Sequence, residues 1–140
     1  MEALAETLKD EDKDVRQTAA IALGEIGGAA AVELLVQSLK DESIMVRYRA
    51  VESLGRIGGS SAVDVLIGAL NDRGWIGLPT SGGKPGTKKA WVRQKAIEAL
   101  EEIGDARAVA PITEALNDKQ EVIRQAAQKA LQKLGASTTG

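Results

Sequence analysis

The stretch Val15–Gly27 reads VRQTAAIALGEIG, and it recurs three more times with the same order of apolar, arginine and glycine positions. The other copies begin at Val46, Val92 and Ile123, so the intervals from residue 15 onward are 31, 46 and 31 residues. Within each copy the apolar residues are spaced by three and four, which is the spacing of one face of an α-helix. The stretch therefore predicts one helix in each of four repeated units.

A second apolar motif alternates with the first and predicts a partner helix in each unit. It reads AAVELLVQSL from Ala30, SAVDVLIGAL from Ser61 and RAVAPITEAL from Arg107, again in steps of 31 and then 46 residues. A fixed period in this range is typical of solenoids, in which each unit buries its apolar face against its neighbours. We therefore expect an all-α fold, a right-handed α-solenoid of four helix pairs and eight helices, with an insertion in the third unit.

The expected domain covers residues 1–135, with repeats at about 1–28, 29–59, 60–104 and 105–135 and a tail at 136–140. Asp12 and Ser43 precede helices as N-caps, because their side-chain oxygens can accept from the first free amides. The first helix is expected to be short, because Met1 aligns with a position inside the later helices. One glycine of each repeat is expected to end its helix with a positive φ. These glycines are Gly27, Gly58, Gly104 and Gly135.

The insertion RGWIGLPTSGGKPGTKKAW, residues 73–91, carries both tryptophans and five of the 15 glycines. We expect residues 73–88 to lie outside the helical stack as its most mobile internal segment, because glycine and proline oppose helix. A phosphate-binding loop is disfavoured, since the spacing from Gly77 to Lys84 is one residue too long and Pro85 replaces the hydroxyl residue.

The composition excludes several chemistries. The 140 residues include no cysteine and no histidine, which removes disulfides, thiol nucleophiles and histidine-based catalysis or zinc binding. The net charge of −2 disfavours a general polyanion binder such as a nucleic-acid protein. No apolar run reaches the roughly 20 residues that span a bilayer. We expect a cytoplasmic protein with no cofactor, no metal and no membrane contact.

The four repeats resemble the HEAT-like repeats of the phycobilisome-lyase type. The resemblance runs from Ala3 to Gly135 and rests on the pattern L-x-D…VR…ALG-x-IG, present four times in register. It implies that the VR helices line the concave face. It also implies a choice of functions, since such repeats serve as protein-binding scaffolds and as parts of bilin lyases. The His-Glu ligand motifs of iron-dependent hydroxylases built on similar helical repeats are missing.

Two charged series follow the repeat. The arginines are Arg16, Arg47, Arg93 and Arg124, and the aspartates are Asp10, Asp41, Asp72 and Asp118. The arginines could form a basic stripe for nucleic acid, or each could bond the acidic turn of its own or the adjacent repeat. Equal numbers at one period favour the second interpretation.

The expected function is non-enzymatic binding of a protein or peptide on the concave face. Residues on the free side of the VR helices, away from the core set, include the aromatic residues of the chain. We expect their apolar side chains to be unnecessary for stacking. The expected partner-binding residues, with the insertion as a flap, are Ile44, Met45, Tyr48, Arg49, Glu52, Trp91, Gln94, Lys95 and Trp75.

Four alternatives stay open at this stage. The two tryptophans could simply pack the insertion onto the helices. The chain could be a bilin lyase or an accessory subunit for chromophore attachment. It could bind nucleic acid through the insertion, where Arg73, Lys84, Lys88 and Lys89 outnumber Asp72. In the absence of a natural partner, the same surface could mediate self-association.

Overall fold

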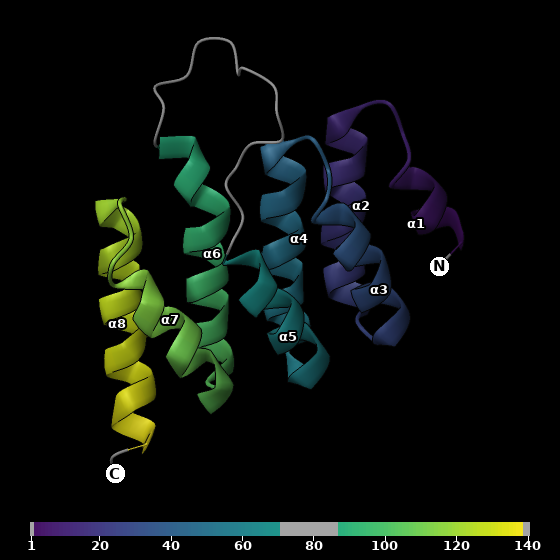
Figure 1. Ribbon diagram of the computed structural model, residues 1–140. Helices are drawn as coiled ribbons and strands as arrows, with labels where there is room; N and C mark the ends of the chain where they lie inside the picture. The colour runs from purple at the N-terminus through teal and green to yellow at the C-terminus, as the bar shows by residue number, and fades with distance from the viewer. Residues whose placement is uncertain (1, 71–86, 139–140) are drawn as a thin grey trace.

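The computed structural model describes the backbone of residues 2–70 and 87–138, and the side chains of these residues except those of 87–90 and 136–138. This part is all helical, with eight α-helices, one 3-10 turn and no strand. The elements are α1 (Glu2–Thr7), α2 (Lys13–Ile26), α3 (Ala29–Ser38), α4 (Ile44–Ile57), α5 (Gly59–Ala69), α6 (Thr87–Ile103), η1 (Ala106–Ala108), α7 (Val109–Ala115) and α8 (Glu121–Thr138). They alternate between an inner row of α2, α4, α6 and α8 and an outer row of α1, α3, α5 and α7 (Figure 1). The predicted α-solenoid of paired helices is confirmed, and its first helix is short.

The core lies between the two rows and consists of aliphatic residues from both repeated motifs. The largest fully buried residues at equivalent positions are Leu23, Leu54 and Leu100 of the inner row and Leu35, Leu66 and Ile112 of the outer row. Helix α3 contacts both α2 and α4, and α5 contacts both α4 and α6. Each such outer helix therefore closes the core between two inner helices. Full burial of one side chain of this size contributes about 1.5–3 kcal/mol, so these positions supply much of the stacking energy.

Small residues bring the inner helices into close contact. A Cβ atom on Gly24 of α2 would lie 2.5 Å from the Oγ of Ser53 on α4, and one on Gly55 would lie 2.7 Å from the Cβ of Ala99 on α6. The Oγ of Ser53 donates to the carbonyl oxygen of Ala20 at 2.8 Å. Neighbouring outer helices touch less extensively. Because a double row bends toward its more closely packed side, the inner row forms the concave face.

The predicted caps are present, with one exception. Asp12 accepts from the amide of Asp14 at the start of α2, and Ser43 accepts from the amide of Val46 at the start of α4. Three of the four predicted C-cap glycines have a positive φ: Gly27 (72°), Gly58 (68°) and Gly104 (76°). The prediction for Gly135 is wrong, because α8 continues through it to Thr138. The residues after Gly135 continue the helix, so Gly135 keeps a helical conformation without a positive φ.

The repeated arginines join one repeat to the next. Arg16 donates through Nη1 to two carbonyl oxygens of the turn before its own helix, at 2.8 and 3.0 Å. Its Nε and Nη2 donate to the carboxylate of Asp41, 25 residues ahead, at 2.8 and 3.1 Å. The hydrogen bond to Asp41 raises the pKa of Arg16 above its ordinary value. Arg93 pairs with Asp118 across the same interval of 25 residues.

The contact within the repeat recurs at two of the other arginines. Arg47 donates through Nη1 to the carbonyl oxygen of Asp41, and Arg124 does the same to the carbonyl oxygen of Asp118 at 2.7 Å. Three of the arginines are buried: Arg16, Arg47 and Arg93. The interpretation in which each arginine bonds an acidic turn is thus confirmed for the described residues. The other interpretation, in which the arginines form a basic stripe for nucleic acid, is wrong for these three because their side chains are buried.

The insertion falls mostly outside the described residues. Residues 71–86, which include Trp75 and Asp72, are not described, so the predicted mobility of the insertion and its role as a flap are untested. Helix α6 begins at Thr87, so Thr87 and Lys88 belong to the helix and not to the insertion as predicted. Gly86 is the last helix-breaking residue, and the lysines after it favour helix. Among the described helices, none has the length and hydropathy that a membrane crossing requires.

Candidate functional site

A groove of about 440 Å³ lies between α4 and α6 on the inner row. Met45, Tyr48 and Arg49 line it from α4, and Trp91, Gln94, Lys95 and Glu98 line it from α6. Spacings of three and four residues place each set on one side of its helix. The repeat thus builds the groove from the same helical positions of two successive units.

Most of the predicted binding residues come together here. Six of the nine line the groove, and Glu52 contacts two of them. Ile44 packs against the core beside it, and Trp75 lies outside the described residues. Glu98 lines the groove but was not among the predicted residues. Its position in α6 matches that of Glu52 in α4, so the repeat register could have identified it.

The apolar side chains differ in how far they are exposed. Trp91 is 39% exposed, and the other exposed large hydrophobic residue in the described part is Ile26. Tyr48 and Ile44 are half-buried and pack against the core. The expectation that the apolar residues of this surface are unnecessary for stacking is therefore wrong for Ile44 and Tyr48. Their rings and methyl groups reach the core because α4 is enclosed by its neighbours on both sides.

Two cations lie near the tyrosine ring, and one carboxylate contacts both of these cations. The guanidinium carbon of Arg49 lies 5.7 Å from the ring centre of Tyr48, and the Nζ of Lys95 lies 5.8 Å from it. Glu52 accepts from Arg49 Nη1 at 3.0 Å, and its other oxygen lies 3.8 Å from Lys95 Nζ. Arg49 and Lys95 therefore share one carboxylate. The Nε of Arg49 is buried and has no acceptor in the described part of the chain.

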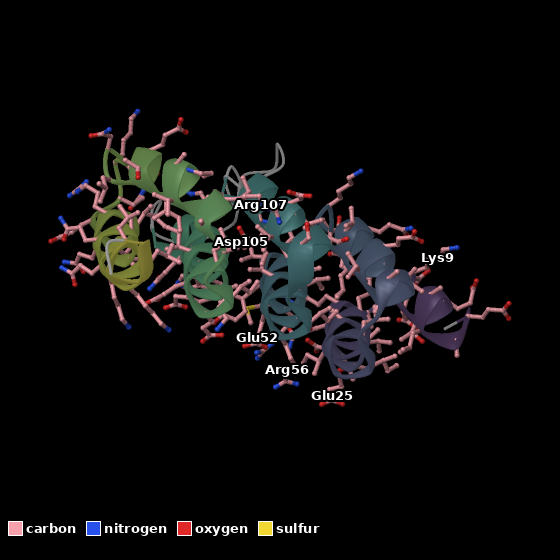
Figure 2. The ribbon with its side chains drawn as sticks, turned by 90° about the horizontal axis from the view of Figure 1, so that it is seen from below. Lys9, Glu25, Glu52, Arg56, Asp105 and Arg107 are labelled. Atoms are coloured by element: carbon pink, nitrogen blue, oxygen red, sulfur yellow. The ribbon has the colours of Figure 1, made fainter. Side chains whose placement is uncertain are left out.

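The charges elsewhere on the two faces are largely exposed. In Figure 2, Glu25, Glu52 and Arg56 lie on the side of the inner row, while Asp105 and Arg107 lie on the opposite side. Arg56 and Glu25 approach to 3.9 Å, with 63% and 66% of their side chains exposed. Exposed pairs of this kind contribute about 0–1 kcal/mol. These exposed charges make the inner face polar outside the groove, but they do not identify a binding site.

A second cavity of about 280 Å³ lies among α5, α6, α7 and α8, lined in part by Leu70, Pro111 and Glu114. Its wall includes Arg93 and Asp118, which bond each other. The charges of that pair are therefore already engaged within the fold. In the described residues, no three carboxylates converge closely enough to hold a metal ion.

Comparisons with solved structures place this architecture among known proteins. Human deoxyhypusine hydroxylase, in a complex with glycerol, is 26% identical, with a TM-score of 0.74 over 96% of this chain and 43% of that one. The complex of CpcE and CpcF of phycocyanin lyase from Nostoc sp. is 26% identical, with a TM-score of 0.71 over 99% of this chain and 53% of that one. An engineered protein that is 22% identical shares the fold, with a TM-score of 0.59 over 95% of this chain and 61% of that one.

The chain spans about half the length of the first two of these structures, 43% and 53%. No curated protein matches the sequence. The family model of HEAT repeats matches residues 1–76 and 86–139, and the resemblance predicted from the repeated motif is confirmed. The chain belongs to the HEAT repeat family.

Proposed function

We propose that this chain binds a protein or peptide partner in the groove between α4 and α6, without catalysing a reaction. The observation that carries the proposal is Trp91, a large aromatic side chain that is 39% exposed beside Met45 and Tyr48. Exposed apolar side chains that lie together mark interaction sites, and tryptophan, tyrosine and arginine are the residues most enriched among binding hot spots.

The charge balance of the groove also suits a protein partner. Arg49 and Lys95 are offset by Glu52 and Glu98, so the site has mixed charge and not the strongly positive field that a nucleic acid requires. The groove lies on two helices that pack against a common core, and such a surface is held rigid before binding. A rigid site reduces the conformational entropy lost on association.

Selection of binding peptides from a random display library, followed by titration of the best sequences, tests the proposal. Trp91→Ala should weaken binding by about 2 kcal/mol or more, because truncating a hot-spot side chain removes its buried contact area. Tyr48→Ala should have a similar effect, but Tyr48 also packs against the core, so the melting temperature of each variant is measured first. Gln37→Ala on the exposed side of α3 is the matched control and should leave affinity unchanged.

Two results would contradict the proposal. One is a selection in which no recovered peptide depends on Trp91. The other is a Trp91→Ala variant that melts at a much lower temperature yet binds the same peptides as before. In that case Trp91 is a packing residue and the binding site lies elsewhere.

A second candidate, an accessory subunit for bilin attachment, rests on the similarity to the CpcE and CpcF complex over 99% of this chain. An open-chain tetrapyrrole needs apolar surface together with groups that pair with its propionates, and Arg49 and Lys95 beside Trp91 could supply both. Mixing the protein with a bilin and recording the visible absorbance tests it. A spectrum equal to that of free bilin at all protein concentrations would exclude binding.

A further inference from the structure

Corresponding residues of α4 and α6 divide the groove into three levels. The two helices come from successive repeats, and residues 46 apart hold the same helical position, as Val46 and Val92 do. The corresponding pairs are Met45 with Trp91, Tyr48 with Gln94, Arg49 with Lys95, and Glu52 with Glu98. The first, third and fourth pairs give the groove an apolar level, a basic level and then an acidic level, and the pair Tyr48 and Gln94 lies between the apolar and the basic level. Adjacent levels are separated by roughly one helical turn, about 5.4 Å.

We propose that the partner is a peptide segment with an apolar side chain at the Met45/Trp91 level and a carboxylate at the Arg49/Lys95 level. This inference rests on the proposed function and specifies the chemistry of its partner. In an extended peptide, side chains two residues apart lie on the same side, about 7 Å from each other. The matching sequence is therefore an apolar residue, any residue, and then aspartate or glutamate.

The basic level has hydrogen-bond donors left for such a carboxylate. A guanidinium carries five N–H donors. In the described part of the chain Arg49 donates through Nη1 to Glu52, and its Nε is buried, so the donors left for a partner are those on Nη1 and Nη2. The Nζ of Lys95 lies 3.8 Å from Glu52, beyond hydrogen-bond distance. Glu52 is therefore the one carboxylate of the described residues that is recorded in contact with both cations, and a carboxylate from the partner would pair with the donors that Glu52 leaves unused.

A cationic partner group fits this level poorly. The ring of Tyr48 already has Arg49 and Lys95 within 6 Å of its centre, at 5.7 and 5.8 Å, so a further cation would meet two like charges. This also disfavours recognition of a methylated lysine by Tyr48 and Trp91 as an aromatic cage. Glu98 borders the basic level on the side away from Trp91 and repels a carboxylate placed there. The acid is therefore confined to the middle of the groove, which sets the direction of the peptide relative to its apolar residue.

The test repeats the peptide selection on the wild-type protein and on the double variant Arg49→Gln/Lys95→Gln. Wild-type selections should be enriched in an acidic residue two positions from an apolar one, and the double variant should lose this preference. Wild-type peptides should bind the double variant at least about tenfold more weakly, since each charge-assisted contact is worth that much or more. Arg56→Gln is the control, because Arg56 is exposed on α4 outside the groove lining and should leave affinity unchanged.

The outcomes separate this inference from the proposed function. Recovery of peptides that depend on Trp91 but are uncharged or basic would contradict the proposed partner carboxylate, while the proposed peptide binding would stand. An absence of any peptide that depends on Trp91 would overturn both. Binding of a single-stranded oligonucleotide that is lost in the double variant, with no acidic peptide recovered, would replace the peptide with a nucleic acid. If circular dichroism shows that the double variant is unfolded, Lys95→Gln alone provides the same comparison, because it leaves the pair of Arg49 and Glu52 in place.

Discussion

Replacing Asp41 with alanine should reveal how much the bridges between repeats stabilise the fold. The carboxylate of Asp41 accepts from Arg16 Nε at 2.8 Å, from Arg16 Nη2 at 3.1 Å and from the amide of Ser43 at 2.8 Å. The side chains of Arg16 and Asp41 are only 10% and 12% exposed, so the variant leaves a guanidinium nearly buried without its main counter-charge. Breaking a buried pair in this way costs about 3–5 kcal/mol. Arg16 keeps two carbonyl acceptors, so we expect the lower end, about 3 kcal/mol.

Asp10 provides the matched control, because it occupies the same position in the first repeat. Its carboxylate accepts from the amide of Asp12 at 2.8 Å, as Asp41 does from Ser43, but no arginine side chain bonds it in the described residues. Asp10→Ala should therefore cost only this hydrogen bond to a turn amide, about 1 kcal/mol.

Urea unfolding, followed by circular dichroism and extrapolated linearly to water, gives the free energy of unfolding of the wild type and of both variants. Equal m-values for the three proteins show that the same transition is compared. Equal losses for Asp10→Ala and Asp41→Ala would refute the reasoning. Such a result would mean that the aspartates act only through the hydrogen bonds within their own turns and that the bridge across 25 residues contributes nothing measurable.

Three further changes have expected outcomes. Gly24→Ala should destabilise the fold by about 1–3 kcal/mol in urea unfolding, because its Cβ would lie 2.5 Å from Ser53 Oγ and push α2 from α4. Gly68→Ala should raise stability by about 0.5–1 kcal/mol, because Gly68 lies inside α5 with no atom within 4 Å of a new Cβ; a loss would contradict the described surroundings. The backbone amide of Arg107, and to a lesser extent its side chain, donate to Asp105 and lower the pKa of that carboxylate below its ordinary 3.8. The carboxylate therefore stabilises the folded protein above pH 3.8, and this contribution is lost as the pH falls through the lowered pKa. The melting temperatures of wild type and Asp105→Asn should therefore converge as the pH falls below about 3.8, and a constant gap would contradict the assignment.

The helix pairs and the arginine bridges could be predicted because each pattern occurs several times in one register. A single VR stretch would be weak evidence for a solenoid, but four copies at one period leave few other folds. The periodic pairing of Arg16 with Asp41 follows from the same argument, since the two series share one spacing. Local sequence and global architecture agree at these positions, and prediction succeeds there.

The wrong prediction of a C-cap at Gly135 shows where the repeat pattern is not sufficient to predict the structure. Gly27 is followed by a second glycine with φ of 88°, and Gly104 is followed by Asp105, which accepts the amide of Arg107 at the next turn. Gly135 is followed by alanine, a strong helix former. A glycine ends a helix where the chain must turn, and the repeat alone does not say whether a turn follows.

The groove was predictable as a set of residues but not as a shape. Helical spacing places Met45, Arg49 and Trp91 on the free side of their helices, and that part of the prediction needs no structure. The burial of Ile44 and Tyr48 depends on how closely α4 approaches its neighbours. That distance is set by small residues such as Gly55 at the contacts between helices, and a linear pattern does not contain it.

The two walls of the groove belong to different repeats, and this affects how the array would unfold. In a solenoid each junction can open while the others remain docked, so the contact between α4 and α6 has its own opening equilibrium. A ligand that bridges both walls binds only the closed junction. At a concentration of 100 times its Kd, it would raise the free energy needed to open that junction by about 2.7 kcal/mol. Occupancy would then slow amide hydrogen exchange in α4 and α6 much more than in α2.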